Sequence, residues 1–283
     1  MSSPLRDKFI RHMVLQGFSP HTQAAYLRAV VELVRYYRCR PDELTNDQIQ
    51  GFLQELIEVR KRTWSTVNVY FSAFRYLYRQ VLGWEQSRFS IPPRGRIKHK
   101  PMLLSREEVS RLIQAAGNAK HRALLMTAYG AGLRVSELVQ LKLSHIESSP
   151  DRMMIRVEQG KGRKDRYTVL FDWVLEELRG YWCEYRPVLW LFVGQDPSRH
   201  LTVSSAQRAY CQAREAAGIT RGRGIHTLRH CFASHLLESG VDLFALKRLL
   251  GHASLQTTAG YLHVGRVQNR PLRSPLDELD LPK

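Results

Sequence analysis

Histidine, arginine and tyrosine side chains gather near the C-terminus in a spacing that could do chemistry. His226 and Arg229 are three positions apart in "HTLRH", and His252 and Tyr261 follow within "LLGHASLQTTAGYLHV". The two histidines of "HTLRH", His226 and His230, could bind a metal ion from one face of a helix, but no carboxylate or cysteine pattern completes a ligand set. The plain structural explanation of Tyr261 is a core tyrosine whose hydroxyl has a partner. That explanation accounts poorly for the combination of all these residues.

Arg134 lies farther upstream, directly after the apolar stretch "AYGAGL". A guanidinium in such surroundings needs an anionic partner, because an unpaired buried charge is costly. One candidate partner is Glu137, one helical turn along the chain. The other candidate is a phosphate group, which the planar fork of an arginine binds through paired hydrogen bonds.

The charge balance favours a polyanionic partner. The chain has 283 residues, with 43 lysines and arginines against 26 aspartates and glutamates, and its isoelectric point is near 10.1. Such a surface attracts DNA, RNA or anionic lipid. The four cysteines are far apart, and the N-terminus carries charges where a signal peptide has an apolar run. No stretch approaches the ~18 apolar residues of a membrane span, so we expect a soluble protein of the reducing cytosol.

A short basic segment divides the sequence. Residues 84–101, "WEQSRFSIPPRGRIKHKP", carry five basic residues and one acid, and their prolines cannot continue a helix. We therefore expect a first domain over 1–86, a linker over 87–101 and a second domain over 102–283. The linker can be interpreted as a solvated hinge, but its charge density favours contact with a phosphate backbone.

The first domain is predicted to be a bundle of four helices. Ser19 and Pro20 signal the start of a helix over 19–38, and Thr45 with Gln48 forms a capping box for another over 45–60. Apolar residues at helical spacing predict the other two helices, over 5–17 and 64–83. The aromatic stripe of the last helix is expected to lie in the core: Val67, Phe71, Phe74 and Tyr78.

The second domain is predicted to combine helices with a small β-sheet. A capping box at Ser105 and Glu108 starts one helix, and further helical patterns cover residues 121–141, 205–218, 226–240 and 242–252. Alternating apolar residues within 152–171 predict a β-hairpin with Lys161 at or beside its turn.

Taken in order, the candidate residues resemble the active-site motifs of the tyrosine recombinases, the group of phage integrases, Xer proteins and integron integrases. The matching stretches are "GLRVSEL" with Arg134, "GKGRKDR" with Lys161, "HTLRH" with His226 and Arg229, "LLGH" with His252, and "TTAGYLHV" with Tyr261. The resemblance covers nearly the whole chain. It implies a mainly α fold with a small β-sheet, in which an N-terminal four-helix SAM-like core-binding domain precedes a C-terminal catalytic domain.

The sequence separation between two of these motifs indicates which branch of the family the chain resembles. Lys161 and His226 are 65 positions apart (226 − 161). That separation is too short for the extra helical insert typical of integron integrases. A simpler Xer-like or transposon-borne integrase is therefore expected. The same motifs serve phage integration, transposition and the resolution of chromosome dimers.

The resemblance also implies a role for each residue of the pocket. Arg134 and Arg229 would stabilise the charge on a phosphodiester under attack, and His252 would donate a further hydrogen bond. Tyr261 would attack phosphorus and form a 3′-phosphotyrosine. A phenol ionises near pH ~10, so the attack needs a proton acceptor, and His226 would fill that role.

The remaining expectations concern the leaving group and the partners. Lys161 would protonate the departing 5′ oxygen, and neither a metal ion nor another cofactor enters the scheme. The implied partners are double-stranded recombination sites, bound by a homotetramer in the bacterial cytoplasm at the nucleoid, with strand exchange through a Holliday junction. The basic residues expected to contact DNA are Arg94, Arg96, Lys98, Lys100, Arg163 and Lys164.

Two other functions stand as alternatives. A type IB topoisomerase has a similar pocket but relaxes DNA without pairing two sites. A DNA-binding regulator could keep this fold without catalysis, although the full set of six candidate residues disfavours it.

The tail after Tyr261 contains a short segment with an apolar edge, "SPLDELDLPK". A segment with this few apolar residues cannot form a core of its own, and it therefore needs another surface to pack against. We expect the tail to dock either on its own domain or on a neighbouring subunit.

Overall fold

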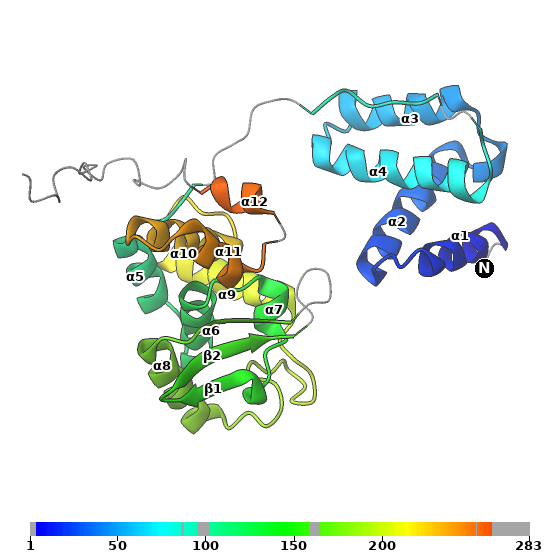
Figure 1. Ribbon diagram of the computed structural model, residues 1–283. Coiled ribbons are helices and arrows are strands. Elements are labelled where there is room, and N and C mark those ends of the chain that lie inside the picture. Colours follow the sequence, from blue (N-terminus) through cyan, green and yellow to red (C-terminus); the bar gives the residue numbers. More distant parts are fainter. Residues whose placement is uncertain (1–3, 86–87, 95–101, 159–164, 253, 262–283) are drawn as a thin grey trace, which may run out of the picture. The chain divides into compact units, whose positions relative to one another are not determined.

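The computed structural model describes residues 4–85, 88–94, 102–158, 165–252 and 254–261. The chain divides into two compact units, residues 1–98 and 99–283. The predicted fold class is confirmed: the described chain is mainly helical, with one three-stranded sheet in the second unit (Figure 1). Among the described residues, no helix is both long and apolar enough to span a lipid bilayer.

The N-terminal unit contains the predicted helices. They are α1 (Pro4–Leu15), α2 (Pro20–Tyr37), α3 (Asn46–Glu58) and α4 (Trp64–Tyr76), with a 3₁₀ turn at Pro41–Glu43. The start signals of two helices are confirmed. Ser19 accepts a hydrogen bond from the Thr22 backbone, with Pro20 beginning α2, and Thr45 and Gln48 form the capping box of α3. One detail differs from the prediction, because the last turn of the fourth helix is π-helical over Leu77–Val81.

The core of this unit is apolar and aromatic. Of the predicted stripe, Val67, Phe74 and Tyr78 are buried and Phe71 packs at the edge of the core. Phe52 of α3 contacts Phe74 of α4 with their ring centroids 6.0 Å apart. The aromatic stripe therefore stabilises the bundle, as predicted.

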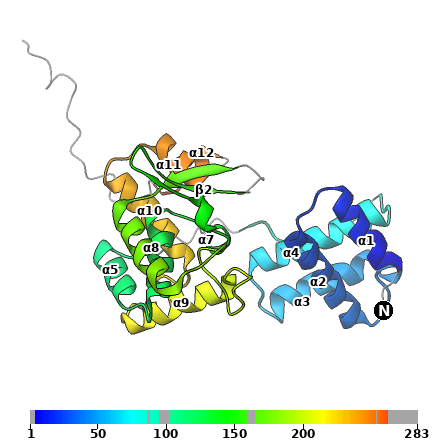
Figure 2. The ribbon, with the colours of Figure 1, turned by 90° about the horizontal axis from the view of Figure 1, so that it is seen from below.

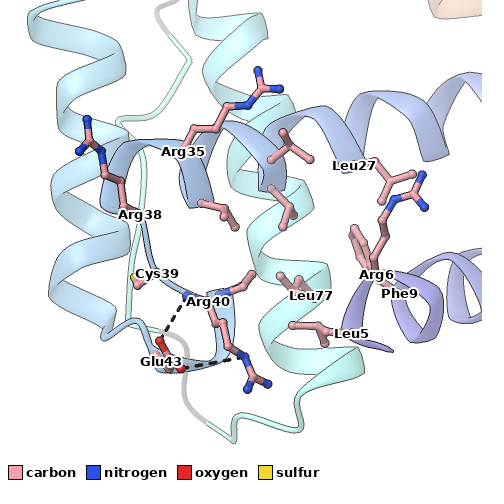
Figure 3. Close-up of a pocket in the computed structure, with 14 residues that line it drawn as sticks. Leu5, Arg6, Phe9, Leu27, Arg35, Arg38, Cys39, Arg40, Glu43 and Leu77 are labelled. Carbon is pink, nitrogen blue, oxygen red and sulfur yellow. Dashed lines mark hydrogen bonds and ion pairs between the residues drawn. The ribbon is translucent and has the colours of Figure 1, made fainter. Parts of the chain in front are cut away.

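A cavity of about 740 Å³ opens on the same unit between α1, α2 and the 3₁₀ turn (Figure 3). Its floor is apolar and includes Phe9, Leu27 and Leu77, whereas Arg6 and Arg35 lie at its rim. None of the candidate catalytic residues lines this cavity.

The C-terminal unit begins with α5 (Arg106–Gln114), α6 (Ala119–Gly130) and the short α7 (Val135–Val139). After a 3₁₀ turn at Leu143–His145, the sheet follows as β1 (Ile146–Ser149), β2 (Arg152–Val157) and β3 (Arg166–Val169). The remaining helices are α8 (Asp172–Tyr185), α9 (Val203–Ala216), α10 (His226–Glu238), α11 (Leu243–Leu250) and α12 (Leu255–Ala259). The capping box at Ser105 and Glu108 is confirmed at the start of α5.

The sheet is antiparallel in the order β1-β2-β3. Its β2–β3 hairpin is the predicted one, with Ile155 opposite Thr168, and the side chains of Ile155 and Val157 are buried in the main core. The pattern did not predict β1, which pairs with the other edge of β2. Helix α11 packs against β3, and α12 packs against α11 (Figure 2).

Two glycines allow close approaches around α10 and α11. Gly132, with φ of +59°, lies where a Cβ atom would be 2.3 Å from the Phe232 ring of α10. Gly251 ends α11 with φ of +63°, and a Cβ atom there would be 2.5 Å from Cδ of Arg166. Only a residue without a side chain fits such positions. These contacts bring β3 and the loop after α6 against the helices that carry the candidate residues.

Candidate active site

Glu137 is a buried carboxylate at the centre of the candidate site. It lies in α7, only 9% exposed, and its Oε1 atom is 2.6 Å from Nη1 of Arg134. Arg166 of β3 donates to both carboxylate oxygens, at 2.8 and 2.9 Å. Burial alone would raise the pKa of Glu137, but the hydrogen bonds and charges of Arg166 and Arg134 outweigh burial and lower it. Glu137 is therefore an anion that holds the guanidinium groups of Arg134 and Arg166 close together.

Arg229 is the most deeply buried cation of the site. It projects from α10 with 1% exposure, and it donates to the Gly132 carbonyl and the Leu250 carbonyl at 2.6 Å each. Those carbonyls lie just beyond α6 and at the end of α11, where carbonyl groups lack helical partners. Burial, followed by the charge of Arg134, lowers the pKa of Arg229 to about 10. The group therefore remains a cation at neutral pH.

Arg134 is the more accessible of the two predicted arginines. It precedes α7, and its side chain is 22% exposed against 2% for Arg229. Its Nη2 atom lies 3.4 Å from the Gly251 carbonyl. Of the two candidate partners named from the sequence, the structure shows Glu137 paired with Arg134. A guanidinium has more N–H donors than these partners use, so Arg134 can also bind a phosphate.

Tyr261 follows α12 and is only 7% exposed. Its hydroxyl oxygen is 3.0 Å from Nδ1 of His230. Its ring stacks on that of His252, with an interplanar angle of 7° and centroids 6.2 Å apart. Burial raises the pKa of Tyr261, although the charges of Arg229 and Arg134 act in the opposite direction. The resting phenol is therefore protonated at neutral pH and needs a proton acceptor before it can attack.

His252 lies just after α11, with Nδ1 2.9 Å from Oγ1 of Thr258. Burial, and then the nearby charge of Arg229, lowers the pKa of His252 to about 4. The ring is therefore neutral at physiological pH. With Nδ1 occupied by Thr258, the other ring nitrogen is the one that could donate a hydrogen bond to a phosphate.

His226 and His230 lie together at the start of α10. The ring of His226 is edge-on to that of His230, with centroids 4.7 Å apart, and His226 is the more exposed of the two residues. Burial of the ring, followed by the charges of Arg229 and Arg134, lowers the pKa of His226. The histidine that contacts the Tyr261 hydroxyl is thus His230, which the sequence analysis considered only as a metal ligand. Its position one turn after His226 was the available signal, because such residues share a helix face.

Several predicted residues lie outside the described residues: Lys161, Arg96, Lys98, Lys100, Arg163 and Lys164. The strands on either side of residues 159–164 are described. Glu158, directly after β2, pairs with Lys142, and Arg166 at the start of β3 binds Glu137. Arg94 lies in the N-terminal unit, with its guanidinium carbon 5.6 Å from the centroid of the Trp64 ring. Among the described residues, no group of histidine, cysteine or carboxylate side chains is arranged to hold a metal ion.

The chain is similar to known proteins along nearly its whole length. The phage integrase family matches residues 103–266, and the phage integrase N-terminal SAM-like domain matches residues 5–88. A putative integrase/recombinase of Sinorhizobium fredii is 37% identical over 99% of this chain and 91% of its own. A tyrosine recombinase XerA of Thermococcus kodakarensis is 34% identical over 93% of each chain.

Solved structures are similar in the same way. A crystal structure of XerA recombinase, 28% identical, covers 95% of this chain and 99% of its own with a TM-score of 0.54. A lambda integrase dimer bound to a core site is 19% identical and shares the fold, with a TM-score of 0.71 over 95% of this chain and 78% of its own. The chain therefore belongs to the phage integrase family and is a site-specific tyrosine recombinase.

Proposed function

We propose that this recombinase cleaves and rejoins DNA through Tyr261, with a 3′-phosphotyrosine intermediate and strand exchange through a Holliday junction. The observation that carries the proposal is the enclosure of one tyrosine hydroxyl in a cluster of buried cations and neutral imidazoles. Tyr261 lies near Arg229 and Arg134, whose charges act on its pKa, and it stacks on His252. A tyrosine with a purely structural role would need only one hydrogen-bond partner, whereas Tyr261 also has two arginines and a stacked histidine nearby.

The arginines are suited to the charge that develops during the reaction. As Tyr261 attacks phosphorus, negative charge grows on the non-bridging oxygens of the phosphodiester. Fixed guanidinium groups stabilise that charge without reorganising, because Arg229 is already held by two carbonyls and Arg134 by Glu137. His252 adds a neutral hydrogen-bond donor.

Two proton transfers complete the proposed cycle. His226 takes the proton that Tyr261 releases as its oxygen bonds to phosphorus. Lys161 gives a proton to the 5′ oxygen as the phosphorus–oxygen bond breaks. The energy of the broken bond is kept in the phosphotyrosine, and the reverse steps rejoin a strand.

The same residues support a metal-independent reaction. Two arginines provide the positive charge that a metal ion supplies in other phosphoryl-transfer sites. Cleavage should therefore proceed equally well in EDTA and in Mg²⁺. Loss of cleavage in EDTA with recovery in Mg²⁺ would overturn this part of the proposal.

We further propose how the protein assembles on DNA. The solved lambda integrase tetramer bound to a Holliday junction suggests four subunits on two sites. The basic residues at 94–100 and 163–164 would contact phosphates, and the tail would dock on a neighbouring subunit. Deleting residues 272–283 should preserve binding to a single site but sharply reduce pairing of two sites. A truncated protein that pairs and recombines sites normally would contradict tail docking.

The decisive experiment uses nicked DNA from which the cleaved fragment diffuses away, so that a covalent intermediate accumulates. The wild type should become attached to the 3′ phosphate, whereas Tyr261→Phe should bind DNA and form no adduct. Tyr129→Phe is a matched control, because Tyr129 also bonds a histidine of α10, with its oxygen 2.9 Å from Nδ1 of His235. An adduct in Tyr261→Phe, or its loss in Tyr129→Phe, would count against Tyr261.

A further inference from the structure

We propose that His230 is a positioning residue that holds the Tyr261 hydroxyl in place for attack. The inference rests on the proposed role of Tyr261 as the nucleophile. It concerns a residue outside the six predicted from the sequence. The direct observation is the 3.0 Å contact between Nδ1 of His230 and the hydroxyl oxygen of Tyr261.

The two residues differ in how firmly the fold holds them. His230 lies in α10, a 13-residue helix whose Leu228, Cys231 and Ala233 are fully buried. Tyr261 follows α12, a helix of only five residues that ends at Gly260. A helix this short has little stability of its own. The nucleophile therefore needs an anchor outside its own segment, and His230 provides one from a rigid element.

The surroundings of His230 keep its ring in one charge state. His226 and Arg229 flank it on α10, and Tyr261 and His252 face it from the segment after α11. Burial, and then His226 and Arg229, lowers the pKa of His230 to about 4. A neutral ring that carries its proton on Nδ1 can donate a hydrogen bond to the phenol oxygen. The phenol proton is then free to move to another acceptor, and the ring stays neutral over the ordinary pH range. His230 therefore acts as a fixed hydrogen-bond partner.

This arrangement separates two tasks. His230 holds the oxygen, and its ring packs edge-on against His226, the proposed proton acceptor. During cleavage the phenol O–H bond breaks, the oxygen bonds to phosphorus, and the proton leaves to His226. A displaced hydroxyl would lose its aligned approach to phosphorus. Misplacing a reacting atom by about 1 Å can cost about 10²-fold in rate.

The test compares three variants of the full-length protein on the nicked DNA. His230→Ala should slow adduct formation by about 10²-fold and leave DNA affinity unchanged. His230→Asn should restore most of the rate, because its amide places a polar atom near the position of Nδ1. His235→Ala is the matched control: it removes a histidine–tyrosine bond from the same helix, to Tyr129, and should keep the wild-type rate.

The pH profile separates positioning from proton transfer. The Asn variant should keep the pH dependence of the wild type, because the proton acceptor is still present. The inference is wrong if Asn is as slow as Ala, if Asn loses the pH dependence, or if His235→Ala is equally slow. It also fails if His230→Ala cleaves normally while Tyr261→Phe forms no adduct. An adduct in Tyr261→Phe would instead overturn the proposed function.

Discussion

The interiors of the two units differ in what they bury. Both have continuous apolar cores, but among the described residues every buried polar or charged side chain, tyrosines apart, lies in the C-terminal unit. They are Thr127, Glu137, His145, Thr168, Arg229, Ser234, His235 and Thr258. Burying charge costs free energy unless partners offset it. The N-terminal interior is explained by stability alone, whereas the C-terminal interior also contains charged groups that the proposed reaction would use.

One buried tyrosine from each unit, Tyr78 and Tyr261, shows the same contrast in the surroundings of its hydroxyl group. Tyr78 of the N-terminal unit donates to the Pro41 carbonyl at 2.7 Å, a bond that satisfies a buried group. Tyr261 bonds a histidine and lies near two arginines. Burial raises the pKa of both phenols. Tyr261, unlike Tyr78, has neighbouring arginines that oppose this rise. Because arginines can also bind a phosphate, a chemical role is favoured at Tyr261 and a structural one at Tyr78.

The largest effect should follow from removing the central carboxylate. Glu137→Ala leaves Arg166 without its carboxylate partner and Arg229 in a more positive interior, so we expect the free energy of unfolding to fall by about 3–5 kcal/mol. Urea unfolding measures this directly. Glu137→Gln keeps the shape and some hydrogen bonds and should be less damaging. An Ala variant as stable as the wild type would show that the buried charges do not depend on one another.

The next effect is on rate. Arg134→Ala should lower covalent cleavage by about two to three orders of magnitude, similar to the loss of one oxyanion donor. Its more exposed side chain makes the effect on stability smaller than that of Arg229→Ala, which would also leave two carbonyls unpaired. Arg94→Ala is the contrasting variant and should weaken DNA binding without slowing cleavage of bound DNA. Equal cleavage by Arg134→Ala and the wild type would contradict the comparison between the units.

Mild acid should destabilise the C-terminal unit gradually. The pKa values of His230 and His252 are lowered to about 4 in the folded protein, and an unfolded histidine titrates near ~6.5. Between these values the unfolded state binds more protons, so stability falls as the pH drops from about 6.5 to about 4. Replacing both histidines with asparagine should flatten that dependence. An unchanged slope would mean that other groups control it.

The smallest effect should come from the N-terminal unit. Tyr78→Phe removes the bond to the Pro41 carbonyl and should lower the free energy of unfolding by about 1 kcal/mol. Cleavage of bound DNA should be unaffected. A strong loss of cleavage in this variant would show that the first unit contributes to chemistry as well as to binding.

Local signals in the sequence predicted much of the fold. Ser19, Pro20 and the capping boxes at Thr45 and Ser105 are formed by residues close in the chain, so their patterns were sufficient. Strand β1 was missed because its short run, "IESS", has no clear alternation and pairs only once β2 is in place. The π-helical turn at Leu77–Val81 likewise has no distinct composition.

The same distinction holds in the site. The motif residues were recognisable because of their order and short local spacings. The contact of His230 with Tyr261 joins residues 31 positions apart, and that of Arg166 with Glu137 joins residues 29 apart. Such contacts depend on how α10, β3 and the segment after α11 pack. A local pattern can place His230 on the same helix face as His226, but it cannot place either histidine against Tyr261.

The glycines at 132 and 251 have a consequence for how this domain tolerates change. Neither has a side chain that could bind a phosphate or move a proton, yet any Cβ atom would collide with Phe232 at one and with Arg166 at the other. Phe232 follows Arg229 by three positions on α10, and Arg166 holds the central carboxylate. In a scan of every substitution, intolerance would therefore extend past the residues that react. It would also include the turns of the backbone that bring those residues together. Glycines that take no part in the chemistry would be among the intolerant positions.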